Sequence, residues 1–266
     1  MSIRFSDQTV WITGASSGIG AALAVAFAAE GASVILSGRN AAALDAVKVK
    51  CGGGALIAFD TTDLAALPEI VAQATALSGT IDILVNNAGI SQRSLALDTS
   101  LDVYRTIMEV DFFAPLVLTQ LVLPAMVAAG KGAIVNIASV AGKIGSPLRT
   151  GYCAAKHAMV GWSDALRAEI AQYGVAVHVV TPGFVRTNVA VNAVQGDGSI
   201  RGRSDPAIEA GVSPEAAAAA ILDGIAAGTR EIRVGDGPEM ALVSLRGSDA
   251  DRLFDMMAGF APVVAR

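Results

Sequence analysis

The chain contains little cysteine, few aromatic residues and few charged ones. Its 266 residues include two cysteines, Cys51 and Cys153, which allow no disulfide framework and no cysteine-based metal centre. Aromatic residues make up 5% and charged residues 16%, and the net charge is −5 without a basic tract. Nucleic-acid binding therefore has no support. The carboxylates and the two histidines show no metal-ligand spacing, so we expect no metal site.

Uninterrupted hydrophobic runs of membrane length are also absent. Hydrophobic residues make up 53% of the chain, but glycine, proline or a charge interrupts each apolar stretch before the roughly 20 residues that a membrane span needs. The segment 1–7 has no apolar signal core. We expect a cytoplasmic protein without a membrane-spanning segment.

Short apolar runs alternate with longer helical patterns along the chain. Most runs are continuously apolar, which indicates strands buried on both faces, as in a parallel sheet covered by helices. The expected strands are 10–13, 33–37, 55–59, 81–86, 133–138, 176–181 and 231–234. The expected helices are 19–30, 41–50, 64–77, 103–129, 152–173 and 214–227. This order predicts an α/β fold: a Rossmann-type, doubly wound parallel sheet of about seven strands with helices on both faces.

No repeat or linker divides the chain, so we expect a single domain over residues 1–266. Residues 184–212 form a long segment with several glycines and charges, which we interpret as a lid over the substrate. Residues 236–266 form a C-terminal extension with a helical pattern near 249–260. Its apolar face could pack on the core or on a second subunit.

A glycine-rich turn, Thr13-Gly14-Ala15-Ser16-Ser17-Gly18-Ile19-Gly20, follows the first expected strand. Glycines there permit a tight turn and let backbone N–H groups approach a pyrophosphate at a helix N-terminus. The strand–turn–helix context distinguishes the turn from a chance cluster of glycines. The expected cofactor contacts in this turn are Gly14, Ser16, Ser17, Gly18, Ile19 and Gly20.

The end of the second expected strand bears on which dinucleotide would bind. An NAD site usually has a carboxylate about 20 residues past the glycines, where it accepts from the ribose 2′-hydroxyl. Here the strand ends Leu36-Ser37-Gly38-Arg39-Asn40, with no carboxylate. The Arg39 guanidinium suits a 2′-phosphate, so we predict NADP(H) in preference to NAD(H). The alternative is that Arg39 is a solvated residue at a helix start.

Tyr152 and Lys156 are four residues apart in an expected helix, which places them on one face. An ammonium beside a phenol favours the phenolate form and suits the tyrosine to acid/base work. Ser139 lies thirteen residues before Tyr152, at the end of an apolar run. Together with the glycine turn, these residues suggest an acid/base site beside a dinucleotide.

The chain resembles the short-chain dehydrogenase/reductase family from about residue 8 to residue 235. Four motifs occur in the family's order: 13–20, Asn86-Asn87-Ala88-Gly89, Ser139, and Tyr152 with Lys156. The resemblance implies interconversion of an alcohol and a carbonyl with NAD(P). Tyr152 would be the acid/base on the substrate oxygen, Ser139 would position that oxygen, and Lys156 would also bind the nicotinamide ribose. Further cofactor contacts implied by the resemblance are Asp60, Thr61, Asn87, Ala88, Gly89, Pro182, Gly183, Val185 and Thr187.

One position departs from the family pattern. Asp111, in Met108-Glu109-Val110-Asp111-Phe112, stands where the family normally has an asparagine that helps hold a water beside the lysine. A carboxylate can accept from such a water but lacks the amide donor, and burial would be costly unless it is paired, for example with Lys156, or protonated. We include Asp111 in the candidate catalytic site. It could retain the relay, be a purely structural substitution, or mark weakened activity.

Other chemically active side chains have structural interpretations. His157 points away from the Lys156 face, His178 lies in an expected strand, and we interpret Cys153 as a packing residue. Arg93 follows the Asn86–Gly89 motif and could contact an anionic substrate, although a solvated loop position is the simpler interpretation. Arg201 and Arg203 in the expected lid have the same two interpretations.

The sequence therefore predicts an NADP(H)-dependent oxidoreductase for a small carbonyl or secondary alcohol. We expect a homodimer or homotetramer, as in most of the family, with the helices 103–129 and 152–173 as the natural interface. Two alternatives stay open: a dinucleotide-binding sensor or scaffold with weak activity, and an epimerase or dehydratase that uses the same tyrosine and lysine.

Overall fold

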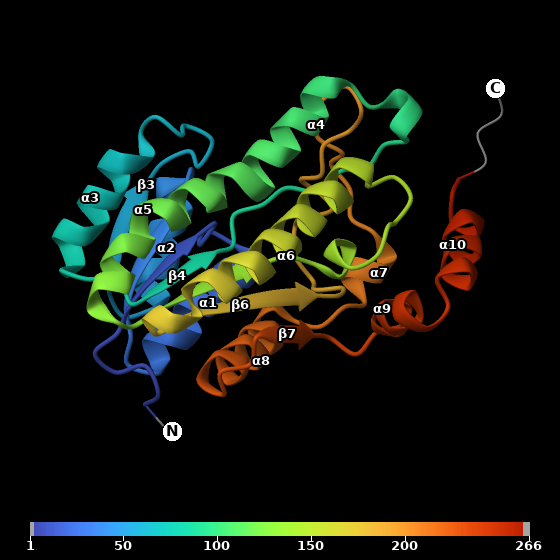
Figure 1. The fold of residues 1–266 in the computed structure, drawn as a ribbon. Coiled ribbons are helices and arrows are strands. Elements are labelled where there is room, and N and C mark those ends of the chain that lie inside the picture. The colour runs from blue at the N-terminus through green and yellow to red at the C-terminus, as the bar shows by residue number, and fades with distance from the viewer. Residues whose placement is uncertain (1–2, 263–266) are drawn as a thin grey trace.

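The computed structural model describes residues 3–262 and contains a seven-stranded parallel sheet between two layers of helices (Figure 1). The strand order is β3-β2-β1-β4-β5-β6-β7, and each neighbouring pair is parallel. The strands are β1 (Thr9–Thr13), β2 (Ser33–Gly38), β3 (Ala55–Ala58), β4 (Ile83–Asn86), β5 (Gly132–Ile137), β6 (Val175–Pro182) and β7 (Glu231–Val234). The predicted doubly wound α/β fold is confirmed.

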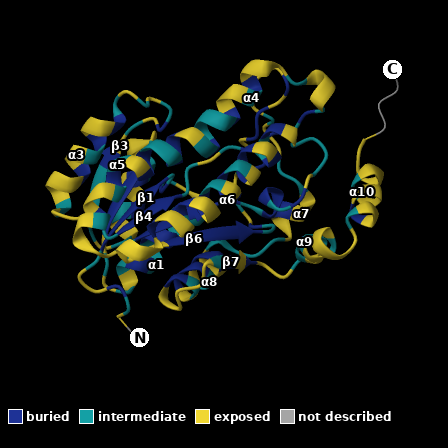
Figure 2. Cartoon of the chain, viewed as in Figure 1, coloured by how far each residue is buried: buried dark blue, intermediate teal, exposed yellow. Residues whose placement is uncertain are grey.

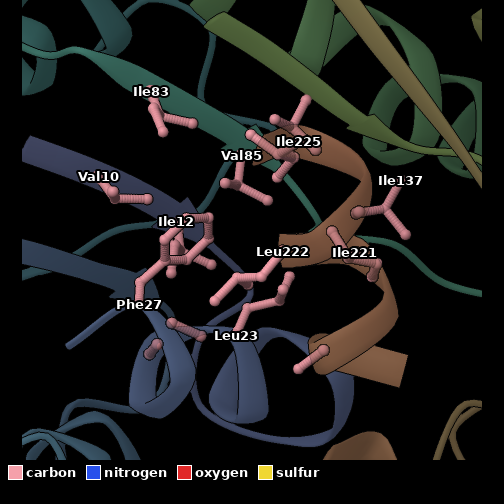
Figure 3. Close-up of a cluster of buried hydrophobic side chains, with 14 of the residues drawn as sticks. Val10, Ile12, Leu23, Phe27, Ile83, Val85, Ile137, Ile221, Leu222 and Ile225 are labelled. Atoms are coloured by element: carbon pink, nitrogen blue, oxygen red, sulfur yellow. The ribbon is translucent and has the colours of Figure 1, made fainter. Parts of the chain in front are cut away.

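Helices cover both faces of the sheet because the strands are apolar on both sides (Figure 2). On one face lie α1 (Gly18–Ala29), α2 (Ala41–Lys50) and α8 (Pro214–Ala226). On the other lie α3 (Leu67–Ser78), α5 (Ala114–Ala129) and α6 (Thr150–Ile170). Leu23 and Phe27 of α1 pack with Ile221 of α8 against Ile12 and Val85 of the central strands (Figure 3).

A nearly continuous helical segment runs through residues 101–129. It consists of α4 (Leu101–Met108), a π-helical turn at Glu109–Phe113, and α5, which contains Pro124. The helix expected over 103–129 is therefore present and is divided by the π-helical turn; Pro115 falls in the first turn of α5, where proline is tolerated, and Pro124 lies inside α5. By length and composition this segment could cross a membrane, and 33% of its most apolar window is buried inside the structure.

The expected lid, residues 184–212, and the C-terminal extension after residue 235 both contain regular secondary structure. Residues 184–212 contain isolated β-bridges at Val185–Val212 and Val194–Ile200, and a third bridge joins Val194 to Gln92. The remaining helices are α7 (Pro206–Glu209), α9 (Pro238–Ser248) and α10 (Ala250–Gly259), with short 3₁₀ turns at Ala96–Asp98, Val140–Gly142 and Ala171–Tyr173. The sequence did not predict α9, which begins after Gly237 without a side-chain cap. Both α7 and α9 lie beyond the carboxyl end of β6 (Figure 1).

Candidate active site

A cleft of about 730 Å³ lies at the carboxyl ends of the strands, including β1 and β4 where the strand order reverses. In doubly wound sheets this reversal leaves a crevice that binds ligands. Of the site residues predicted from sequence, eighteen line the cleft: Gly14, Ser16, Ser17, Gly18, Ile19, Arg39, Asp60, Thr61, Asn87, Ala88, Gly89, Ser139, Tyr152, Lys156, Pro182, Gly183, Val185 and Thr187. The two that do not are Gly20 and Asp111.

Hydrogen bonds of Thr13 and Asn87 hold the glycine turn in place. Asn87 Nδ2 donates to the carbonyl oxygens of Thr13 (2.9 Å) and Gly14 (3.2 Å), and Thr13 Oγ1 accepts from the N–H groups of Asn87 and Ala88. Gly14 has a φ of +65°, and a Cβ there would lie 2.8 Å from the Ala88 Cα. Gly20 is buried against Gly14 and the Asn87 amide, so it shapes the turn from behind.

Two oppositely charged residues, Arg39 and Asp60, line the cleft. Arg39 is exposed and lines the cleft directly after β2. Asp60 Oδ1 accepts hydrogen bonds from the Thr62 N–H (3.0 Å) and Oγ1 (2.8 Å). These bonds, with a smaller contribution from the Arg39 charge, hold the pKa of Asp60 below its usual range. Among residues 3–262, no carboxylate lies within ion-pair distance of Arg39, so its guanidinium is available to a ligand.

The first two turns of α6 bring Tyr152 and Lys156 into the same cleft. Lys156 Nζ lies 5.6 Å from the centre of the Tyr152 ring and donates to the Ile137 carbonyl oxygen at 3.1 Å. Ser139 begins the 3₁₀ turn after β5, and its Oγ accepts from the Ala141 N–H. The three predicted side chains therefore line the same cleft.

Gln92 is a buried residue that the sequence did not single out. Its Oε1 accepts from the N–H groups of Gly151 (2.7 Å) and Tyr152 (3.4 Å), and its Nε2 donates to Ser94 and Thr99. Because Arg149 at the helix start provides no side-chain cap, Gln92 caps α6 from a distant loop. No local motif could have indicated this contact.

Asp111 is fully buried behind the cleft wall, in the π-helical turn. Its Oδ2 forms an ion pair with Lys156 Nζ at 3.3 Å, and its Oδ1 accepts from the Ile90 N–H at 2.8 Å. Burial raises the pKa of Asp111, against the opposing effect of Lys156. Burial alone would lower the pKa of Lys156, but the charges of Asp111 and Tyr152 raise it overall. The pairing anticipated from sequence is present.

A second unforeseen contact comes from the C-terminal extension. Glu239, in the first turn of α9, is 7% exposed, and its Oε1 accepts from the Phe184 N–H at 2.9 Å. Gly183 and Gly237 surround the carboxylate so closely that a Cβ on either would overlap it. Oε2 is buried without a hydrogen-bond partner among the described residues. Glu239 thus holds the backbone next to Gly183, which lines the cleft.

Of the residues to which the sequence analysis gave no catalytic role, two have the expected structural role and two do not lie in solvent as expected. His178 is buried and its Nδ1 bonds the Thr229 carbonyl oxygen at 2.7 Å, and Cys153 is buried as a free thiol, so both structural interpretations are confirmed. The solvated interpretation of Arg93 and Arg201 is wrong. Their side chains are 8% and 14% exposed, and both form ion pairs with Asp205.

Comparison with known proteins places this site in a family. The model of the short chain dehydrogenase family matches residues 8–198. The chain is 40% identical to Dehydrogenase/reductase SDR family member 7B of Danio rerio over 250 residues, covering 90% of this chain and 81% of that protein. A short-chain dehydrogenase structure from Streptomyces avermitilis matches with a TM-score of 0.82 and 28% identity, covering 95% of this chain and 96% of that one.

A third match has the same fold at lower identity. A short-chain dehydrogenase/reductase from Burkholderia phymatum, solved in complex with NAD, has a TM-score of 0.82 and 24% identity, covering 94% of this chain and 96% of that one. The chain belongs to the short-chain dehydrogenase/reductase family. It is an oxidoreductase of that family with a single Rossmann-type domain.

Proposed function

We propose that this chain uses NADP(H) to interconvert a carbonyl and a secondary alcohol. One observation carries the proposal: Ser139, Tyr152 and Lys156 line the same cleft as the glycine turn and Arg39. A proton-transfer group and a dinucleotide-type cradle therefore share one space. The family's relatives named as dehydrogenases or reductases support the reaction class.

The cradle fits a dinucleotide by shape and charge. At Gly14 and Gly18 the backbone has positive φ, and a Cβ at Gly14 would meet Ala88, so the backbone itself borders the cleft at the start of α1. A helix N-terminus with accessible N–H groups favours a pyrophosphate. Arg39 supports a 2′-phosphate because it carries positive charge at the position where NAD sites usually have a carboxylate.

The protein's own groups would move the proton. When bound, the nicotinamide would supply or accept the hydride. In the reducing direction Tyr152 would donate its hydroxyl proton to the substrate oxygen, and in the oxidising direction the phenolate would take it back. Ser139 would donate a hydrogen bond to that oxygen, and the Lys156 ammonium would provide positive charge beside the phenol.

We also propose that the protein is cytoplasmic and forms a homodimer or homotetramer. A cytoplasmic homodimer or homotetramer would cover apolar side chains on the 101–129 segment, where Leu101 is 61% and Phe113 is 42% exposed. Size measurement in solution, with Phe113→Ser as the interface variant, tests this. A monomeric wild-type chain would exclude it.

The enzymatic test follows the absorbance of NADPH with a panel of carbonyl substrates. Tyr152→Phe should lower kcat by about 10²- to 10⁴-fold, the usual contribution of a positioned acid/base, while the Kd of NADPH changes little. Tyr173→Phe is the matched control, because Tyr173 is 45% exposed just after α6. Equal turnover by Tyr152→Phe and wild type would overturn the assigned role.

A further inference from the structure

Three arginines gather around a single aspartate beside the cleft. Asp205 Oδ1 forms an ion pair with Arg201 at 2.6 Å, and Asp205 Oδ2 bonds the Arg93 Nε at 3.0 Å and lies 3.8 Å from Arg149. Among the described residues, no other carboxylate lies within ion-pair distance of these guanidiniums. Three positive charges and one negative charge leave an excess of two positive charges, in a chain whose net charge is −5.

The arginine cluster is partly buried, and not all of its N–H groups have hydrogen-bond acceptors. Arg93, Arg149 and Arg201 have side chains that are 8%, 21% and 14% exposed. The Nη1 of Arg201 is buried and has no hydrogen-bond partner among residues 3–262. Burial, and then repulsion from Arg93, lowers the pKa of Arg149. Both observations show guanidiniums that an additional anion would stabilise.

The three arginines lie next to the cleft rather than among its lining residues, and backbone hydrogen bonds join the segments that carry them. The Arg93 N–H donates to the Val194 carbonyl, the Arg201 N–H donates to the Ala193 carbonyl, and the Ser94 N–H donates to the Leu148 carbonyl. These bonds tie the loop after β4 and the start of α6 to the 184–212 segment.

Each arginine is also close in sequence to a residue that lines the cleft. Ile90 precedes Arg93 by three residues, Ile200 immediately precedes Arg201, and Tyr152 follows Arg149 by three. Arg149 is the residue that precedes α6, and it is close enough to Tyr152 for the tyrosine to affect its pKa electrostatically.

We infer that Arg93, Arg149 and Arg201 form a subsite for an anionic group of the substrate, a phosphate monoester or a carboxylate. This inference rests on the proposed carbonyl/alcohol chemistry and names the substrate class for that same cleft. The substrate would place its carbonyl at Tyr152 and its anionic group at the arginines, with Asp205 holding the guanidiniums in position before binding. A phosphate dianion would balance the two excess charges, whereas a carboxylate would balance one.

The test uses matched pairs of ketones that differ only in charge. One pair is a phosphorylated hydroxyketone and its parent hydroxyketone, and the other is a keto acid and its methyl ester. The measured quantity is the ratio of kcat/KM for the charged and neutral members of each pair. We expect the ratio to exceed one, and the pair with the larger ratio identifies the anion.

Arg149→Met should lower that ratio about 10- to 100-fold, the contribution expected of a hydrogen bond to a charged group. Arg203→Met is the matched control: it removes the same charge from the segment that carries Arg201, but Arg203 is exposed and forms no ion pair among the described residues, so the ratio should not change. An unchanged ratio in Arg149→Met overturns the inference.

Asp205→Asn separates a binding subsite from a purely structural latch. If the arginines form a subsite, loss of the competing carboxylate leaves three excess positive charges and raises the ratio of kcat/KM for the charged over the neutral substrate. A latch would weaken both members of each pair equally, and that result would also overturn the inference. If neither member of either pair is turned over by wild type, the proposed function itself fails, which is a distinct outcome.

Discussion

The two ends of the cleft are built in different ways. At the dinucleotide end, the glycine turn is shaped by backbone conformation and held by Thr13 at the end of β1 and Asn87 directly after the neighbouring β4. At the substrate end, charged side chains join segments far apart in sequence, as in the contacts of Arg93 with Asp205 and of Glu239 with Phe184. The first end can therefore be recognised from a motif, and the second depends on how distant segments meet.

If the dinucleotide end acts through local contacts, Arg39 alone should discriminate NADPH from NADH. Arg39→Ala should raise the Kd of NADPH about 10- to 100-fold, because a charge-assisted hydrogen bond to phosphate is lost, while the Kd of NADH changes little. Fluorescence titration with both cofactors measures this. Lys50→Ala, which removes an exposed charge at the end of α2, is the control, and an equal loss for both cofactors would show that Arg39 does not read the 2′-phosphate.

A backbone-shaped turn should also be intolerant of added volume. Gly20→Ala places a methyl group against the Asn87 amide and the Gly14 carbonyl and should reduce the free energy of unfolding by about 1–3 kcal/mol, as overpacking does. Gly161→Ala is the contrast, because Gly161 is exposed in α6 with nothing within 4 Å of an added Cβ. It should stabilise the protein by roughly 0.5–1 kcal/mol. Thermal unfolding of both variants tests the prediction, which a harmless Gly20→Ala would refute.

The substrate end should respond to a change made far away in sequence. Glu239→Ala leaves the Phe184 N–H without its acceptor and should weaken NADPH binding and lower the thermal midpoint, with a cost of about 1–3 kcal/mol. Glu239→Gln keeps an oxygen acceptor and should largely restore both quantities. Glu215→Ala, on the exposed first turn of α8, is the control. If Glu239→Gln lowers NADPH affinity and the thermal midpoint as much as Glu239→Ala does, the hydrogen bond to Phe184 is not the cause of either effect.

The smallest expected effect is a change in pH dependence at Asp111. Since Asp111 raises the pKa of Lys156, the lysine stays charged up to a higher pH than it would alone and loses its charge as pH rises through that raised pKa. Asp111→Asn removes this support, so the alkaline limb of the kcat profile should move to lower pH. Measuring kcat across the alkaline range checks the direction, and an unchanged profile would leave Asp111 with a structural role only.

Much of the fold and of the cofactor end could be predicted from sequence. Continuous apolar strands indicated the parallel sheet, and the glycine turn, Arg39, Ser139, Tyr152 and Lys156 were named because short local spacing carries their signal. Gln92 and Glu239 were not named, because a lone glutamine or glutamate has no pattern until the tertiary structure brings it to a backbone N–H group. Arg93 was assigned to solvent for the same reason: its partner, Asp205, is 112 residues away.

The sequence alone determined the order of strands and helices, the site of the glycine turn and the helical spacing of Tyr152 and Lys156, since each follows from backbone geometry over a few residues. Only the tertiary structure decided which charges meet. It decided between the possible partners of Asp111 in favour of Lys156, set Glu239 against Phe184 and gathered three arginines around Asp205. The physical reason is that buried charges must find partners, and which partners are within reach depends on the packing of the whole chain.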